Sequence, residues 1–286
     1  MGVKLSFIIV TWNSEEFISQ LLTGLPQGED YETIVVDNGS QDQTVKIIEK
    51  NFPAVKLIKN TQNQFLSRAT NQAFNISKGE YLLLLNPDVI IKREAIETML
   101  DFIDKHSEVG ALGPKLFNPD GTLQPSCREF PTLGNILWEF SIIPRIFKSL
   151  SRWKMGYFDH NHTREVDQPI GSCLMVRRDA FIKAGMMDES LPLFCNDVSL
   201  CYNIKKAGYK IYFLAEAAGL HHHGASVKKV MVKTIIEAHH SLYCYLRRSY
   251  NKNFLLYLIG TLIFISAVLR IICYRLSKTI ISPIKK

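Results

Sequence analysis

A run of five apolar residues at positions 81–85 limits the fold of this chain more than any other segment. Gly79 opens the run and Asn86-Pro87 closes it, which predicts a short strand buried on both faces. Asp88 follows directly, and the ligands of open α/β sheets bind outside the carboxyl ends of the strands. We therefore expect Asp88 to lie at a ligand site, where its carboxylate suits a hard cation and a phosphate. The alternative is an ordinary Asn-Pro-Asp turn in solvent.

Apolar strands alternate with amphipathic helices through the first 110 residues, which predicts a doubly wound, mostly parallel α/β sheet. We expect strands at residues 5–10, 33–36, 55–58 and 81–85, and helices after Asn13, after Ser40, at 67–77 and around 96–103. Two of the helix starts rest on capping patterns, Asn13 with Glu16 and Ser40 with Gln43. The loop that follows the first strand has no GxGxxG sequence, which disfavours a dinucleotide-binding oxidoreductase.

The pattern is looser in the second half of the chain. Asn118-Pro119-Asp120-Gly121 predicts a turn between short strands, and residues 127–165 predict an irregular excursion. Regular structure is then expected as a strand at 170–176, helices at 179–184 and 196–207, and a strand at 210–214. A histidine cluster begins at His221.

Charge is divided unevenly along the 286 residues. Residues 1–226 carry 23 Lys/Arg and 26 Asp/Glu, whereas residues 227–286 carry 11 Lys/Arg and a single acid. We therefore expect two regions, a slightly acidic body over 1–226 and a helical, basic and hydrophobic region over 227–286 that meets an anionic membrane surface or nucleic acid. The six cysteines form no CxxC pair, which indicates reduced thiols.

Residues 254–269 form an uncharged stretch within that tail. As a helix it reaches about 24 Å, short of the ~30 Å hydrocarbon core of a bilayer. An extension to Tyr274 would be long enough, but basic residues on both sides oppose a single crossing. We expect an interfacial or re-entrant anchor; the alternative is a helix packed on the catalytic domain or in a dimer interface.

Three acids stand at predicted strand ends or loops. Asp37 could accept hydrogen bonds from a nucleobase or ribose, and Asp88 could bind a divalent cation that bridges two phosphates. Asp197 is either a first-turn acid that stabilises its helix or a general base. The histidines are either metal ligands or surface residues.

The chain resembles family 2 glycosyltransferases, in particular the rhamnosyltransferase-like branch that builds bacterial surface polysaccharides. The resemblance covers residues 5–226 and consists of eight blocks in the same order, at 6–14, 34–40, 79–88, 113–116, 118–121, 171–178, 196–201 and 221–226. It implies a GT-A-like fold and inverting hexosyl transfer from dTDP-rhamnose or a UDP-sugar. It also implies a divalent metal, Mn²⁺ or Mg²⁺, and a glycan or lipid-linked glycan acceptor.

The resemblance also implies roles for individual residues. Asp37 matches the acid that contacts the nucleotide base, and Asp88 matches the last residue of a metal-binding DxD-like triad. His221 matches a histidine near the diphosphate and metal, and Asp197 matches the catalytic base. The neighbouring positions complete the donor side with Thr11, Asn13, Asn38 and Asn86, and the acceptor side with Gly171, Ser172 and Asn196.

Three positions depart from the family pattern. Asn196 replaces the usual Glu, which leaves Asp197 without a like charge beside it. Gln64 stands where glycine is usual, so close approach of the backbone there is in question, and Ser199 replaces an acid that is often present.

Other classes remain as alternatives. A nucleotidyltransferase would carry a glycine-rich basic loop after the first strand, and this chain has none there. A processive synthase would carry a QxxRW motif after the base. Arg152-Trp153 instead precedes Asp197, and Ser149 stands where the motif has Gln. A catalytically silent sugar-binding homologue stays open. Nucleic-acid binding would explain the basic tail but not Asp88 and Asp197 together, so we expect no nucleic-acid partner. The expected location is the cytoplasmic face of the cell membrane, and a homodimer is left open.

Overall fold

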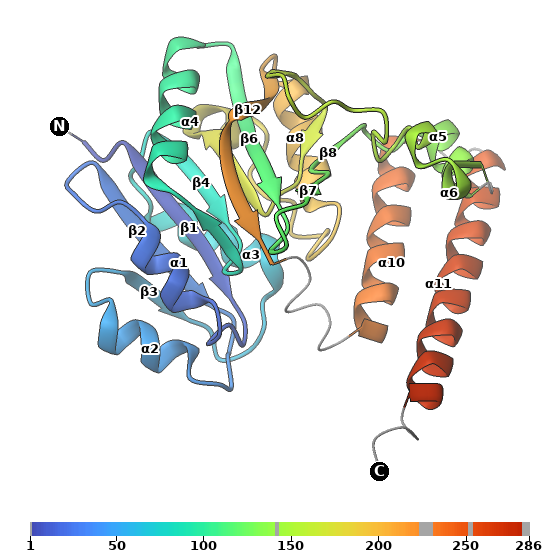
Figure 1. Cartoon of the computed structure of the whole chain (residues 1–286), viewed down its shortest axis with the longest axis horizontal. Coiled ribbons are helices and arrows are strands. Elements are labelled where there is room, and N and C mark those ends of the chain that lie inside the picture. The colour runs from blue at the N-terminus through green and yellow to red at the C-terminus, as the bar shows by residue number, and fades with distance from the viewer. Residues whose placement is uncertain (1, 141–142, 223–230, 251–253, 282–286) are drawn as a thin grey trace.

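The computed structural model describes residues 2–140, 143–222, 231–250 and 254–281. Its centre is one mixed sheet whose first four strands are parallel, in the order β3-β2-β1-β4. These strands and the helices between them are β1 (Leu5–Thr11), α1 (Ile18–Gly24), β2 (Tyr31–Asp37), α2 (Thr44–Asn51), β3 (Lys56–Lys59), α3 (Phe65–Ile76) and β4 (Tyr81–Leu85). The predicted alternation of strands and helices is confirmed in this half (Figure 1).

Beyond β4 the sheet contains both parallel and antiparallel strands. Its further elements are β5 (Val89–Ile91), α4 (Arg93–Lys105), β6 (Val109–Phe117), β11 (Cys173–Arg177), α7 (Arg178–Lys183), α8 (Asn196–Lys206) and β12 (Lys210–His221). Strand β11 lies antiparallel between β4 and β6, β12 is parallel to β6, and β5 is antiparallel to β12. Six of the eight strands along the sheet therefore run in one direction, as the prediction of a mostly parallel sheet requires.

Strand β4 is buried on both faces, as its sequence predicts. Tyr81, Leu83 and Leu85 belong to one apolar cluster, which α1 and α4 cover, while Leu82 and Leu84 belong to a second cluster, which α3, α7 and α8 cover. The sheet is thus the middle of three layers. Because both of its faces are covered, ligands can reach it only at the strand ends.

Both predicted capping boxes are wrong. Helix α1 begins at Ile18 rather than after Asn13, and neither α1 nor α2 has a side-chain cap at its N-cap residue. Asn13 takes a left-handed φ of 52°, and its Oδ1 accepts a hydrogen bond from the backbone N of Gln41 at 2.7 Å. Ser40 donates its hydroxyl to Asp37 instead of capping α2. These side chains join two loops that are neighbours in space, so they are not available to the helices that follow them.

The excursion at 127–165 is irregular over about half of its described residues, and it contains helical segments that the sequence did not indicate. Around it lie β7 (Leu123–Gln124), β8 (Cys127–Arg128), α5 (Leu133–Phe140), α6 (Ile143–Ile146), the 3-10 helix η1 (Lys148–Leu150), β9 (Arg164–Glu165) and β10 (Gln168–Pro169). The predicted turn at 118–121 is confirmed: it connects β6 to antiparallel β7, and Gly121 takes the positive φ of 80° that favours glycine.

Two long helices, α10 (Met231–Ser249) and α11 (Phe254–Ile281), end the described chain. They pack against α5 and α8 through a third apolar cluster that contains Ile136, Val198, Leu246 and Ile259. Within the described residues, α11 is the one helix that is long and apolar enough to cross a membrane, over Phe254–Leu276 with a mean hydropathy of 2.4. No side chain from Phe264 to Leu276 is buried.

Candidate active site

The predicted site residues meet at one edge of the sheet, where the parallel strands end. The register of β1 and β2 pairs Thr11 with Asp37, and Asn86-Pro87-Asp88 follows the end of β4. Asp197 comes from the first turn of α8, and His221 is the last residue of β12.

Asp37 is 2% exposed and closes the loop after β2. Its Oδ1 accepts hydrogen bonds from the hydroxyls of Thr11, at 3.0 Å, and Ser40. Its Oδ2 accepts the backbone N–H groups of Gly39, at 3.1 Å, and Ser40, at 2.9 Å. Because these four bonds use the lone pairs of the carboxylate, contact between Asp37 and a nucleobase would require the exchange of one of these donors. The base contact stays a prediction.

Asn38 ties this loop to the next one. Its amide donates to the carbonyl of Phe65 at 3.1 Å and accepts from Asn60 Nδ2 at 3.0 Å. Gln64 has an ordinary φ of −88°, and the left-handed conformation falls on Phe65, with a φ of 62°. The backbone at position 64 therefore does not require glycine, although glycine is usual there in the family.

Asp88 and His221 lie side by side, as the resemblance implies. The antiparallel pairing of β5 with β12 sets His221 opposite Val89, and His221 Nε2 lies 3.4 Å from Asp88 Oδ1. Both residues are buried, and the backbone N of His222 donates to the carbonyl of Asp88 at 2.9 Å. The backbone N of Asn86 donates to Ser172 O at 2.9 Å, which fixes the start of the same loop.

This pair fits a divalent cation. A carboxylate oxygen and an imidazole nitrogen are both metal ligands, and Asp88 Oδ1 and His221 Nε2 lie 3.4 Å apart, so one cation could contact both atoms. Among the residues that the structure describes, no group of three or more His, Cys, Asp or Glu could hold a metal ion. Two protein ligands leave the other positions of a divalent cation open to substrate phosphates and water.

Asp197 has a structural role in α8, and its role as a general base stays a prediction. Its Oδ1 accepts the backbone N of Val198 at 2.9 Å within α8, and its Oδ2 leaves the helix to accept the backbone N of Gly171 at 3.1 Å. Burial raises the pKa of Asp197 above its ordinary range, although hydrogen bonds, including one from Gln168, oppose that rise. A carboxyl group with a raised pKa is a stronger proton acceptor than an exposed aspartate.

Gly171 is required by the close approach of Asp197. A Cβ at position 171 would lie 2.8 Å from Asp197 Cβ, closer than real Cβ contacts allow. Gly171, Asn196 and Asp197 line a cavity of about 30 Å³ that reaches Asn86. This cavity is large enough for water, and it is lined both by Asn86, at the start of the loop that carries Asp88, and by Asp197 of α8. The nearby Ser172 Oγ is buried without a hydrogen-bond partner among the described atoms.

Sequence reasoning missed three residues at this edge, Gln124, Arg128 and Gln168. The Arg128 guanidinium donates to the carbonyls of Pro125, at 3.2 Å, and Cys127, at 2.7 Å. Burial lowers the pKa of Arg128, whereas the negative charge of Asp197 raises it, so Arg128 is a cation close to the carboxylate of α8. All three residues lie on two-residue strands, which are too short to give a periodic signal in the sequence.

The fold and this edge define a GT-A-like transferase of nucleotide-activated sugars. The chain belongs to glycosyl transferase family 2, whose family model matches residues 6–185. It is 28% identical over 259 residues to N-acetylglucosaminyl-diphospho-decaprenol L-rhamnosyltransferase of Mycobacterium tuberculosis, covering 85% of this chain and 83% of that one. It is 21% identical over 222 residues to rhamnosyltransferase WbbL of Escherichia coli, covering 75% and 82%.

A solved structure shares the fold. The mannosyltransferase PcManGT from Pyrobaculum calidifontis, in complex with GDP-Man and Mn²⁺, matches with a TM-score of 0.59 and 16% identity. The match covers 92% of this chain and 70% of that one. The predicted fold class, family and rhamnosyltransferase-like branch are therefore confirmed, and the chain is a glycosyltransferase.

Replacing Gly171 with Ala should lower the rate of sugar transfer. The new Cβ would push Asp197 away from its position, and a displacement near 1 Å costs up to about 10²-fold in rate. We expect kcat to fall by about 10- to 100-fold. Gly134→Ala is the matched control, because a Cβ there meets its nearest atom, Thr132 Oγ1, only at 4.0 Å. A parental kcat in Gly171→Ala would show that the close approach does not position the carboxylate.

Proposed function

We propose that this enzyme transfers a sugar from a nucleotide-diphosphate donor, dTDP-rhamnose or a UDP-sugar, to a hydroxyl of a lipid-linked glycan, with inversion and with a divalent metal. One observation carries the proposal. Asp88 lies two residues from Asn86 and beside His221, and Asn86 shares a cavity with the half-buried Asp197. The loop that carries the proposed cation ligand and the proposed base therefore meet at one cavity.

Each group has a distinct chemical task. Asp88 and His221 would hold Mn²⁺ or Mg²⁺, which neutralises negative charge that develops on the departing diphosphate. Asp197 would accept the proton of the acceptor hydroxyl as that oxygen attacks the sugar carbon. The loops joined by Thr11, Asn13, Asp37 and Asn38 would form the nucleotide side, and Gly171, Ser172 and Asn196 would form the acceptor side.

The cavity supports a single displacement. Among its described lining residues, Asp197 is the one ionisable side chain, so one base is present and a second carboxylate that could form a covalent sugar intermediate is not. The nucleotidyltransferase alternative lacks support, because the loop after β1 carries no glycine-rich basic sequence and instead bonds to the loop at 40–44. Similarity to the L-rhamnosyltransferase of Mycobacterium tuberculosis, which acts on N-acetylglucosaminyl-diphospho-decaprenol, supports a rhamnosyl donor and a lipid-diphosphate acceptor.

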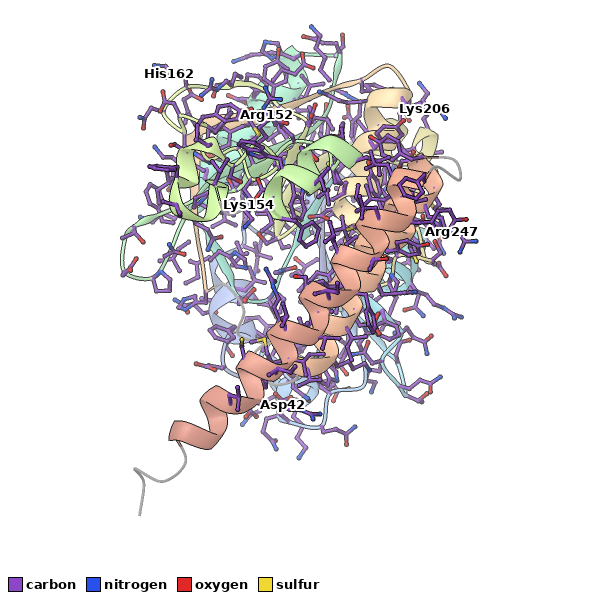
Figure 2. All side chains as sticks on the ribbon, turned by 90° about the vertical axis from the view of Figure 1, so that its right-hand side faces the viewer. Asp42, Arg152, Lys154, His162, Lys206 and Arg247 are labelled. Atoms are coloured by element: carbon purple, nitrogen blue, oxygen red, sulfur yellow. The ribbon has the colours of Figure 1, made fainter. Side chains whose placement is uncertain are left out.

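The C-terminal region would attach the enzyme to the cytoplasmic face of the membrane. Helix α10 runs beside the first half of α11, where His239 Nε2 lies 3.3 Å from Ser266 Oγ. The part of α11 with no buried side chain, from Phe264 to Leu276, is about 20 Å long, which is less than the ~30 Å of a bilayer core. This geometry supports an interfacial anchor rather than a crossing. Figure 2 shows α11 running along one side of the molecule, with Arg247 near the end that packs on α5.

Asp88→Asn should abolish metal-dependent donor binding. The amide keeps the shape of the side chain but removes the charge that attracts the cation. We expect the shift in thermal midpoint caused by UDP, dTDP, GDP or CDP with Mn²⁺ to disappear, since only ligands that bind the native state raise the midpoint. Asp101→Asn, an exposed acid on α4, is the control and should keep the shift. Full activity of the parent in excess EDTA would refute the metal role.

Asp197→Asn should lower kcat by about 10²-fold or more while donor affinity stays near the parental value, because the proton acceptor alone is removed. In the parent, the base must be deprotonated, so the rate should fall as the pH drops through the pKa of Asp197. Because burial raises that pKa, this loss should occur at a higher pH than the ordinary value of 3.8 would give. A parental rate in Asp197→Asn would leave Asp197 with only its structural role in α8.

Acidic substitutions on the exposed face of α11 should release the enzyme from membranes. Phe264, Leu269 and Ile272 are 69%, 56% and 47% exposed, so replacing all three with Asp removes apolar area and adds negative charge without opening the packed core. We expect the triple variant to move from the membrane pellet to the supernatant at low salt. Ile182→Asp, at a 51% exposed site on α7, is the control and should stay in the pellet. If the parent chain is itself in the supernatant at low salt, the anchor idea is wrong.

A further inference from the structure

The turn at 118–121 has no part in the function proposed above, yet its side chains lead directly to His221. Thr122 Oγ1 lies 2.6 Å from Asp120 Oδ1, and Asn118 Nδ2 lies 2.9 Å from Thr122 Oγ1. Gln124 Nε2 lies 2.8 Å from Asn118 Oδ1, and Gln124 Oε1 lies 2.8 Å from His221 Nδ1. Five side chains thus form one hydrogen-bonded series that ends at the predicted metal ligand.

The sheet explains why the series reaches His221. Strand β6 lies between β7 and β12, and Leu116 pairs with Gln124 on one side and with Gly219 on the other. His221 is two residues beyond Gly219 and therefore faces the same side of the sheet. Gln124 is 7% exposed, so its amide group is held in the interior beside that strand end.

The chemistry at one end fixes the direction of every bond. The carboxylate of Asp120, whose pKa is lowered by its hydrogen bonds from Thr122, can only accept, so the Thr122 hydroxyl donates to it. Thr122 Oγ1 then accepts from the NH₂ of Asn118, which turns the Asn118 oxygen toward the NH₂ of Gln124. The oxygen of Gln124 is left facing His221 Nδ1, and it can only accept.

The bond between Gln124 and His221 decides which ring nitrogen of His221 carries the hydrogen. Because Gln124 Oε1 is an acceptor, Nδ1 must carry a hydrogen, and a neutral imidazole then has its lone pair on Nε2. Nε2 is the atom that lies 3.4 Å from Asp88 Oδ1. The polar turn therefore selects the tautomer of His221 that can bind a cation beside Asp88. In metal sites, hydrogen bonds of this kind to the second ring nitrogen orient the ligand and increase its basicity.

We propose that Gln124 is a positioning residue for the metal site: oriented by Asn118, Thr122 and Asp120, it holds His221 with its proton on Nδ1 and its lone pair on Nε2 toward Asp88. The proposal rests on the proposed function in one respect, that Asp88 and His221 hold the divalent cation.

Two substitutions of Gln124 test this role in the full-length chain. Gln124→Met keeps a similar volume but offers no hydrogen-bond acceptor to Nδ1, whereas Gln124→Glu keeps an acceptor oxygen. We expect Gln124→Met to lower the affinity for Mn²⁺ by about 10- to 100-fold, measured by the free-Mn²⁺ signal in electron paramagnetic resonance with a nucleotide diphosphate present. Gln124→Glu should keep the parental affinity or exceed it. Gln20→Met, at an exposed site on α1, is the control and should bind as the parent does.

A second readout follows the proton itself. Nitrogen chemical shifts of ¹⁵N-histidine protein, assigned to His221 by the signals that disappear in His221→Asn, should show a protonated Nδ1 and an unprotonated Nε2 in the parent with metal. Metal-free Gln124→Met should populate the other tautomer, with a thermal midpoint close to that of the parent.

The outcomes separate the two ideas. If the parent binds no Mn²⁺ with any nucleotide, the metal part of the proposed function fails, and the nitrogen shifts of the metal-free protein still decide the role of Gln124. If the parent binds Mn²⁺ and Gln124→Met binds it equally well, with Nδ1 still protonated, the positioning role is overturned.

Discussion

The pairing of β5 with β12 is the interaction on which the candidate active site depends. Strand β5 has only three residues, and it places His221 opposite Val89 and therefore beside Asp88, although the two site residues are far apart in the chain. The bond from His222 N to Asp88 O closes the same ladder. Strand β4 supplies the rigid support for this pairing, because it is buried on both faces and ends at Leu85, directly before Asn86-Pro87.

The parts of this fold that sequence could predict are those in which burial repeats along the chain. The strands at 5–11, 31–37 and 81–85 and the acids beyond them follow from apolar runs that end at polar residues. The predicted helix starts failed because Asn13 Oδ1 accepts from Gln41 N and Ser40 Oγ accepts from Asn13 N, and a capping pattern does not report such distant partners. Gln124 and Arg128 could not be found for a similar reason, since their roles depend on strands of two residues.

The contacts between α8 and α3 give a structural reason for asparagine, rather than the glutamate usual in the family, at position 196. Pro192 O accepts the backbone N–H groups of Leu66 and Ser67 at the start of α3, and Asn196 Nδ2 donates to Ser67 Oγ at 3.2 Å. Asn196 thus ties α8 to α3 by a neutral hydrogen bond, where a glutamate would place a second negative charge beside Asp197. The raised pKa of Asp197 consequently has burial as its main cause, without a neighbouring carboxylate.

The same helix, α8, connects the proposed base, Asp197, to the proposed anchor. Val198, adjacent to Asp197, packs in the cluster that contains Ile136 of α5 and Ile259 of α11. Removal of α10 and α11 would therefore expose the apolar side of α8 and loosen the element that carries the base. An anchor that packs directly on this helix would hold the reaction cavity at a fixed height above the bilayer. The lipid-linked acceptor that we propose would be confined to that surface, so the packing of α11 would determine which of its hydroxyls could reach Asp197.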